Sequence, residues 1–311
     1  MVVMKGKKSF FANIKETANT IGLFNIDIHK PREDNEIKNE DIISLTDIHK
    51  ELNSLIGMEN IKELIAEINA FVNINKKRRE NNLTTEQLVF HMIFSGNPGT
   101  GKTTVARILG KFFYTIGVLD KGHIIEVERA DLVGEFVGQT AQKVKEKIEE
   151  AMGGILFVDE AYSLARGGDR DFGKEAIDTL VKTMEDRKNE FILILAGYKR
   201  EMEYFLSSNP GLRSRFPIHL KFNDYSIDEL MNIAELMARK RQYEITLEGK
   251  RELFNIIIQK QIEKESEKFG NAREIRNIIE RAIRRQALRI SQKGLITKDD
   301  LIYIRSEDFK Y

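Results

Sequence analysis

The sequence predicts an α/β fold in which a five-stranded parallel sheet is covered by helices and followed by a small helical domain. Three observations support this prediction. Short apolar runs alternate with helical segments between residues 88 and 222, which is the pattern of a parallel sheet covered on both faces. A glycine-rich turn with the spacing of a phosphate-binding loop follows the first run. After Asn223 the strand pattern stops and only helical periodicity continues.

The first structured domain is expected from residue 45 to residue 222. It begins with a helical pattern at Leu45, and a longer amphipathic helix runs from Ile61 to a basic cluster at residues 76–79. Its strands are expected at residues 88–95, 123–128, 155–158, 191–196 and 218–222. The helices between them are expected at residues 102–116, 140–152 and 174–186. The third strand is continuously apolar, as strands buried on both faces are.

Two segments flank this domain. Residues 1–44 contain scattered apolar pairs and a polar stretch at residues 31–36, so we expect an N-terminal extension that is partly flexible. The alternative is that this extension binds an adaptor or partner. Residues 223–311 are expected to form the small helical domain, whose first helix opens with a capping box from Ser226 to Glu229.

Composition restricts the possible functions. The chain has 311 residues, of which 32% are charged and 41% hydrophobic, and its net charge of +1 gives no general attraction to nucleic acid or acidic membranes. The absence of cysteine excludes disulfides, thiol catalysis and cysteine metal sites, and it fits a reducing, cytoplasmic compartment. The apolar runs are too short to span a membrane. We therefore expect neither a nucleic-acid partner nor a membrane partner.

The phosphate-binding loop has the sequence pattern G-x-x-x-x-G-K-T from Gly96 to Thr103. Its glycines permit a tight turn whose N–H groups face a phosphate chain, and Lys102 would reach the β- and γ-phosphates. The Thr103 hydroxyl would hold Mg²⁺, and the following helix would point its positive end at the same anion. The nucleotide-binding residues predicted here are Asn97, Pro98, Gly99, Thr100, Gly101, Lys102, Thr103 and Thr104. The alternative is a glycine-rich turn beside a chance lysine.

Two acids end the third strand. In a parallel α/β sheet, the carboxyl end of such a strand lies beside the phosphate-binding loop. Asp159 would hold Mg²⁺ directly or through water, and Glu160 would orient an attacking water and accept its proton. The alternative is a strand that ends in two solvated acids. With the phosphate-binding loop upstream, the pair instead favours hydrolysis of the bound nucleotide.

Phosphoryl transfer also needs positive charge at the γ-phosphate in the transition state. Arg213 and Arg215, which precede Phe216-Pro217, are two candidates for this role. Arg273, at the start of a predicted helix, is a third. Because arginines are common on protein surfaces, spacing alone does not distinguish among the three.

These motifs come in the order found in the AAA+ ATPases, which the chain resembles. The shared stretches are Leu55-Ile56-Gly57, the Walker A motif at residues 96–103, the Walker B motif at residues 155–160, Arg213–Pro217 and Gly270–Arg273. Finer stretches at residues 121–141, 159–164, 172–177 and 195–198 resemble the CbxX/CfxQ subfamily. The resemblance covers about residues 50–290 and leaves residues 1–44 outside. It is greatest to the sporulation members of the subfamily and more distant to red-type Rubisco activases.

The resemblance implies a homo-oligomeric ring, usually a hexamer, with ATP bound at the interfaces between subunits. In such a ring Arg215 would reach the γ-phosphate of a neighbouring subunit, with Arg213 as its companion, and Arg273 would sense the phosphate of its own subunit. Ile56 and Gly57 would lie against the adenine.

The resemblance also implies two loops that face a central pore. Phe136, Val137 and Gly138 would form the loop that grips a threaded polypeptide, and residues 165–171 would form a second, mobile loop. The alternative for Phe136 is a core aromatic, but its glycine-rich surroundings are a poor setting for a core strand.

One position departs from the AAA+ pattern. Many members carry Asn, Ser or Thr after the fourth strand, where the side chain positions the attacking water. This chain has Ala196-Gly197-Tyr198 there. Tyr198 either supplies a hydroxyl or packs.

The resemblance thus implies Mg²⁺-dependent ATP hydrolysis by a ring-forming motor that remodels or threads a protein partner, in spore maturation. One alternative is a Rubisco-activase-like remodelling factor, and another is a DNA-acting motor, which the balanced charge disfavours. A nucleotide switch without hydrolysis is a third, but a pure binder needs neither Glu160 nor Arg215.

Overall fold

The computed structural model describes residues 44–310 apart from residues 86–87, 137, 167–170 and 264–269. Residues 43–311 form one compact unit. The predicted N-terminal extension, the pore-loop residue Val137 and the centre of the predicted second loop therefore lie outside the described residues.

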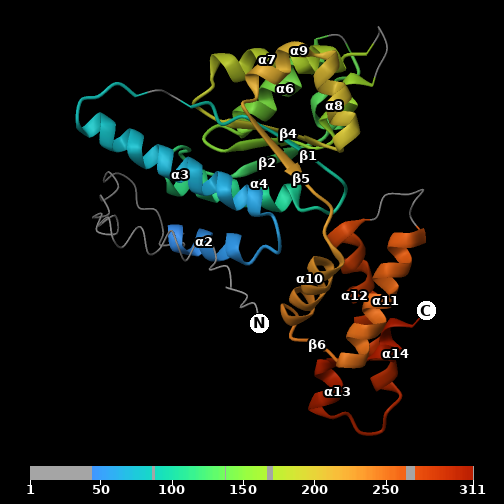
Figure 1. Cartoon of the computed structure of the whole chain (residues 1–311). Coiled ribbons are helices and arrows are strands. Elements are labelled where there is room, and N and C mark those ends of the chain that lie inside the picture. The colour runs from blue at the N-terminus through green and yellow to red at the C-terminus, as the bar shows by residue number, and fades with distance from the viewer. Residues whose placement is uncertain (1–43, 86–87, 137, 167–170, 264–269, 311) are drawn as a thin grey trace, which may run out of the picture. The chain divides into compact units, whose positions relative to one another are not determined.

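A parallel sheet of five strands forms the centre of the first structured region, as predicted (Figure 1). Its strands are β1 (Met92–Gly96), β2 (Ile124–Val127), β3 (Ile155–Val158), β4 (Ile192–Gly197) and β5 (Ile218–Phe222). They lie in the order β2-β3-β4-β1-β5, and every neighbouring pair is parallel. Since β4 lies between β1 and β3, the carboxyl ends of these three strands come together at one edge.

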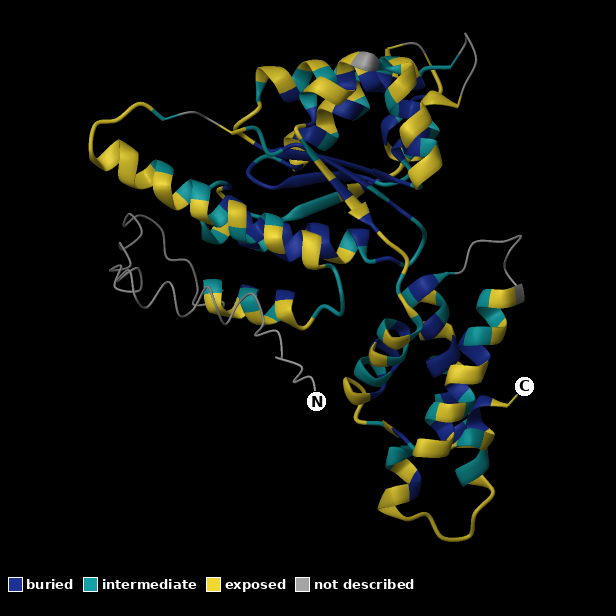
Figure 2. Cartoon of the chain, in the orientation of Figure 1, coloured by how far each residue is buried: buried dark blue, intermediate teal, exposed yellow. Residues whose placement is uncertain are grey.

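Helices cover both faces of this sheet and bury two separate apolar cores (Figures 1 and 2). One face is packed against α2 (Leu45–Asn53), α3 (Glu59–Glu80) and α4 (Lys102–Thr115). The other is packed against α5 (Arg129–Leu132), α6 (Gln139–Glu150), the 3₁₀ helix η1 (Ala161–Ala165), α7 (Gly173–Asp186), α8 (Lys199–Ser208) and α9 (Pro210–Arg215). Because both faces are covered, all the side chains of β3 and β4 are buried.

His91 lies just before β1 and joins two neighbouring segments. Its Nδ1 accepts a hydrogen bond from the Leu193 N–H at 3.0 Å, and its Nε2 lies 3.3 Å from the Met184 carbonyl oxygen. The ring also packs against Phe191 and Phe216. Burial lowers the pKa of His91 to about 4, so the imidazole stays neutral and serves the fold.

The C-terminal region is mainly helical, as predicted, with α10 (Ile227–Arg239), α11 (Leu247–Glu263), α12 (Asn271–Ser291), α13 (Lys298–Ile302) and α14 (Ser306–Phe309). Ser226 and Glu229 form the predicted capping box at the start of α10. The expectation that strands end at residue 222 was wrong in one respect, because β6 (Glu244–Ile245) pairs with β7 (Tyr303–Ile304). Two-residue strands are too short to show an alternating pattern. None of the described helices is long and apolar enough to cross a membrane.

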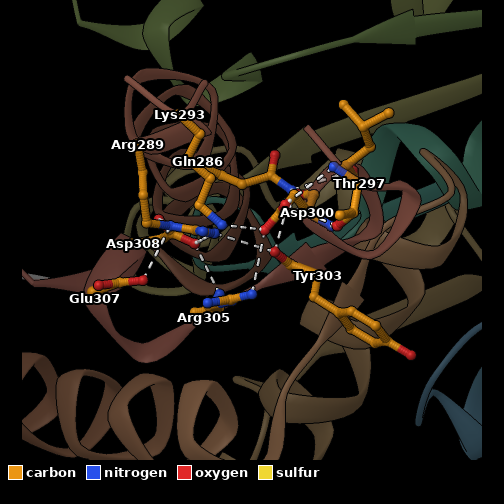
Figure 3. A network of polar contacts seen from close by, with 10 residues as sticks. Gln286, Arg289, Lys293, Thr297, Asp300, Tyr303, Arg305, Glu307 and Asp308 are labelled. Carbon is orange, nitrogen blue, oxygen red and sulfur yellow. Dashed lines mark hydrogen bonds and ion pairs between the residues drawn. The ribbon is translucent and has the colours of Figure 1, made fainter. Parts of the chain in front are cut away.

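Two buried acids tie the end of α12 to the segments after it (Figure 3). Asp308 accepts hydrogen bonds from Arg289 Nε and Nη2, both at 2.9 Å, and Asp300 binds Lys293. The hydrogen bonds from Lys293 and Thr297 hold the pKa of Asp300 well below its usual range. This network, together with the buried side chains of Ile304 and Phe309, fixes the path of the chain after α12.

Candidate active site

The phosphate-binding loop joins β1 to α4 through two left-handed glycines, Gly99 at φ +73° and Gly101 at φ +94°. Gly101 is the N-cap residue of α4, so the loop leads directly into the N-terminus of that helix. A Cβ atom at Gly99 would overlap the Gly270 carbonyl oxygen and would come within 2.9 Å of the Arg273 nitrogen. Glycine is therefore required at Gly99 both for its backbone angle and for space.

Lys102 lies buried at the start of α4 with its ammonium turned into the loop. Its Nζ donates to the carbonyl oxygens of Gly96 at 2.9 Å and Asn97 at 3.0 Å. Burial lowers the pKa of Lys102, and the charges of Asp159 and Glu160 oppose that shift. The lysine and the two acids thus come together, as predicted from their separate motifs.

Asp159 and Glu160 follow β3 directly. Asp159 Oδ1 accepts the backbone N–H of Glu160 at 2.9 Å. Glu160 has left-handed backbone angles, φ 46° and ψ 41°. Such a conformation costs a non-glycine residue about 1–3 kcal/mol and is concentrated at functional sites. The left-handed turn therefore sets the direction of the Glu160 side chain, and it does so with a strained backbone.

Tyr198 comes directly after β4 and reaches the same acid. Its hydroxyl donates a hydrogen bond to Glu160 Oε1 at 3.1 Å. Its ring centroid lies 5.8 Å from Lys102 Nζ and 5.7 Å from the ring of Tyr162. Burial, and then the bond to Glu160, raise the pKa of Tyr198, so the hydroxyl keeps its proton. The hydroxyl of Tyr198 thus binds Glu160 while its ring packs against Tyr162, so the side chain shows both features that the sequence left as alternatives.

Thr103 and Asp159 are the residues that would hold Mg²⁺. The described residues contain no group of three or more His, Cys, Asp or Glu side chains that could bind a metal. A Mg²⁺ ion would therefore take its remaining ligands from phosphate oxygens and water, which is the coordination it commonly adopts. One hydroxyl and one carboxylate, both only partly buried, fit that donor set. Thr104, the next residue of α4, is exposed.

The phosphate-binding loop is also hydrogen-bonded to Asp224 and Asn271, two residues that sequence reasoning missed. Asn97 Nδ2 donates to both carboxylate oxygens of Asp224, at 2.9 and 2.8 Å. Asn271 Nδ2 donates to Asp224 Oδ1 at 2.8 Å and lies 3.3 Å from the Pro98 carbonyl oxygen. Asp224 therefore links the loop to the first residue of α12.

Two more bonds strengthen this junction. The Ala272 N–H donates to the Gly99 carbonyl oxygen at 3.1 Å, and the Tyr225 hydroxyl donates to the Thr100 carbonyl oxygen at 3.3 Å. Asn271 is fully buried and has a left-handed backbone at φ 46°, a conformation that asparagine tolerates better than most residues. The sequence feature that could have indicated this junction is an asparagine beside Gly270 at the start of a predicted helix.

The segment predicted to contact the adenine lies near the same junction. Ile56 packs against the core of the C-terminal region, and Gly57 has a left-handed backbone at φ +69°. A Cβ atom at Gly57 would overlap the Glu229 carboxylate, so a side chain there would displace the carboxylate that caps α10. Contact with adenine stays a prediction for both residues.

The three candidate arginines have different surroundings in the structure. The charge of Arg273 acts on both Lys102 and Tyr198, so Arg273 lies near the site of its own chain. Arg215 donates to Glu185 of α7 and to the Gly211 carbonyl oxygen. Arg213 is exposed on α9. Only Arg273 is thus brought into the site of the described chain.

The predicted pore loop places its aromatic residue in solvent. The Phe136 side chain is 66% exposed, which excludes the core alternative in this chain. The loop backbone is braced because Gln139 Oε1 accepts the N–H groups of Glu135 and Phe136, each at 3.3 Å. Gly138 has a left-handed backbone at φ +83° and is the N-cap residue of α6.

Arg129 braces the predicted second loop at both of its ends. Its guanidinium donates to the Ser163 carbonyl oxygen at 2.7 Å and to both carboxylate oxygens of Asp171, at 2.6 and 2.7 Å. Arg166 lies over the Tyr162 ring, 4.6 Å from its centroid. Since Tyr162 and Ser163 come two and three residues after Glu160, the base of this loop is continuous with the acidic turn.

Comparison with protein families gives two matches. A family model described as "ATPase family associated with various cellular activities (AAA)" matches residues 92–224, and one described as "AAA lid domain" matches residues 226–311. Together they include the whole sheet and the C-terminal helical region, whereas α2 and α3 precede both matches.

Several curated relatives align along most of the chain. Stage V sporulation protein K of Bacillus subtilis is 54% identical over 264 residues, which are 85% of this chain and 82% of the relative. A CfxQ homolog of Galdieria sulphuraria is 46% identical, covering 82% of this chain and 83% of the relative. The chloroplastic ribulose bisphosphate carboxylase/oxygenase activase of Cyanidioschyzon merolae is 43% identical, covering 85% and 89%.

Among solved structures, the AAA domain of FIGL-1 is similar in fold, with a TM-score of 0.56 at 18% identity, covering 82% of this chain and 79% of that one. Its complex with ADP gives a TM-score of 0.55 at 19% identity, covering 98% and 90%.

Proposed function

Because the chain belongs to the AAA+ ATPases of the CbxX/CfxQ type, we propose that it is a ring-forming motor that uses Mg²⁺ and ATP to remodel or thread a protein partner. The chain is an ATPase; the ion, the ring and the protein partner are the proposed parts. The cysteine-free composition supports a cytoplasmic location. We propose residues 45–222 as the nucleotide-binding domain and residues 223–311 as its lid.

We infer the following roles in hydrolysis. Lys102 holds the β- and γ-phosphates, and Glu160 accepts a proton from the water that attacks the γ-phosphorus, with ADP as the leaving group. Thr103 and Asp159 hold Mg²⁺, which neutralises charge on the phosphate oxygens. Support comes from the closeness of Lys102, Asp159, Glu160 and Arg273 around the phosphate-binding loop.

A ring explains the position of Arg215. Its partly exposed guanidinium binds Glu185 on the surface of α7, whereas Arg273 already supplies positive charge to the site of its own chain. A partly exposed arginine on the surface can reach a neighbouring subunit's γ-phosphate once it leaves Glu185. The proposed active site is therefore shared between two subunits.

A protein partner is favoured by the exposure of Phe136, the observation that carries this proposal. A large aromatic side chain that is 66% exposed on a braced loop buries no core surface, so its apolar area is available to a partner. A DNA-acting motor would need a basic surface, and the net charge of the chain is only +1.

Two relatives suggest different biological settings. The name of the Bacillus subtilis relative refers to sporulation, and its identity to this chain is 54%, against 43% for the Rubisco activase of Cyanidioschyzon merolae. We therefore propose spore maturation as the setting, with Rubisco-activase-like remodelling as the second candidate.

The test uses Glu160→Gln, which should bind ATP and lose at least about a hundredfold in turnover. Held in ATP on a tagged ring, this variant should retain its partner from extracts of sporulating cells. The matched control adds Phe136→Ala to the same variant, which should bind ATP equally and release the partner. A retained nucleic acid, or a protein retained equally without Phe136, would contradict the proposed threading function.

A further inference from the structure

Tyr198 stands at the position from which many AAA+ ATPases direct an amide or hydroxyl at the nucleotide. In this chain its hydroxyl donates to Glu160 Oε1 at 3.1 Å. A phenolic hydroxyl has one proton to donate, whereas an asparagine amide has two. While Tyr198 holds Glu160, it therefore has no proton left to donate to a phosphate oxygen.

The Tyr198 ring has a defined place between two motifs. Its centroid lies 5.8 Å from Lys102 Nζ and 5.7 Å from the centroid of the Tyr162 ring. The backbone before it is tightly packed, since a Cβ atom at Gly197 would come within 2.7 Å of both Tyr162 and Met202. The strand end and the neighbouring ring thus restrict where the hydroxyl can reach.

Glu160 is held at two points. Its backbone N–H is bound by Asp159 Oδ1 at 2.9 Å, which accompanies the left-handed turn at φ 46°. Its carboxylate is bound through Oε1 by Tyr198, which leaves Oε2 outside that bond. One oxygen anchored and the other available is the arrangement that a carboxylate needs to orient a water and take its proton.

We propose that Tyr198 is a positioning residue for ATP hydrolysis, which acts by holding the Glu160 carboxylate toward the attacking water and not by contacting the γ-phosphate. This inference rests on the role of Glu160 proposed above. Since hydrogen bonds to charged groups are the stronger class, loss of the hydroxyl should be visible in turnover.

The test is steady-state ATP hydrolysis by Tyr198→Phe, which removes one oxygen and keeps the ring. The expected result is a loss in kcat of up to roughly tenfold. The KM for ATP and the affinity for ADP should stay unchanged. The matched control is Tyr162→Phe. Tyr162 contacts Tyr198 through the rings, and in the described chain no hydrogen bond joins its hydroxyl to Glu160, so its kcat should change less than about twofold.

A double-mutant cycle identifies the residue through which Tyr198 acts. In single-turnover hydrolysis with enzyme in excess, Tyr198→Phe should cause no further loss in the Glu160→Gln background. An additive loss would overturn the inference, as would full activity of Tyr198→Phe. A raised KM with unchanged kcat would do the same, because it would assign the hydroxyl to the nucleotide.

Two controls keep these outcomes separate. Thermal unfolding should give Tyr198→Phe and Tyr162→Phe midpoints close to that of the unmodified chain. Normal turnover in Glu160→Gln would remove the proposed role of Glu160 itself. An inactive Glu160→Gln beside a fully active Tyr198→Phe would refute only the role of Tyr198.

Discussion

Replacing Arg215 with alanine should separate catalysis from stability. In the described chain the guanidinium binds Glu185 and the Gly211 carbonyl oxygen, and the Arg215 and Glu185 side chains are 35% and 51% exposed. Exposed ion pairs contribute at most about 1 kcal/mol to stability. Arg215→Ala should therefore lower the free energy of unfolding by about 1 kcal/mol or less.

The expected loss in catalysis is far larger. An arginine that reaches the γ-phosphate in the transition state contributes roughly 10³- to 10⁵-fold to turnover. Release from Glu185 would offset only about fivefold of that gain, because about 1 kcal/mol corresponds to that ratio. Arg215→Ala should therefore remain folded and lose at least about a thousandfold in turnover.

The assay mixes two inactive variants. Arg215→Ala keeps its own Glu160, while Glu160→Gln keeps its Arg215. In randomly mixed rings, roughly one interface in four joins an intact acid to a neighbour's intact arginine. Equimolar mixing should therefore restore up to roughly a quarter of the unmodified ATPase rate, and Arg213→Ala serves as the matched control.

Two results would refute this reasoning. In the first, mixed rings recover no activity although differently tagged subunits show that mixing occurred. The arginine would then act within its own chain or not at all. The other is an active Arg215→Ala beside an inactive Arg213→Ala, which would identify the companion arginine as the catalytic one.

Three further predictions concern the loop, the fold and the C-terminal region. Phe136→Ala should leave ring assembly and the free energy of unfolding unchanged, because Phe136 is 66% exposed. The variant should nevertheless uncouple ATP hydrolysis from work on the partner. An unfolded variant would contradict this prediction. The pKa of His91 is about 4 in the fold against 6.5 when unfolded, so the unfolded chain binds the proton first as pH falls. That effect should remove about 2 kcal/mol of stability between pH 7 and pH 5, and urea unfolding of His91→Gln should show a smaller pH dependence. Asp308→Ala leaves the partly buried Arg289 without its main partner, so it should lower the free energy of unfolding in urea by about 3 kcal/mol. The control Glu307→Ala, at a side chain that is 55% exposed, should lower it by less than about 1 kcal/mol. Equal losses in the two variants would refute the role of Asp308.

The sequence by itself determined the features that depend on neighbours along the chain. The loop from Gly96 to Thr103 needs glycines and a lysine at fixed spacing, and the structure has left-handed backbone at Gly99 and Gly101. The strands at residues 155–158 and 218–222 begin and end as predicted, because the first is an apolar run between Gly154 and Asp159 and the second alternates apolar and polar residues between Pro217 and Asn223. The fold class followed from strands and helices that alternate.

Only the tertiary structure decided which side chains meet across the sheet and the lid junction. The Tyr198 hydroxyl reaches Glu160 across 38 residues, and Asn97 binds Asp224 across 127. Arg215 was a candidate by spacing, but its partner Glu185 could not be read from the sequence. The physical reason is that strand order and side-chain direction set these contacts, whereas the sequence pattern reports only periodicity and local backbone preference.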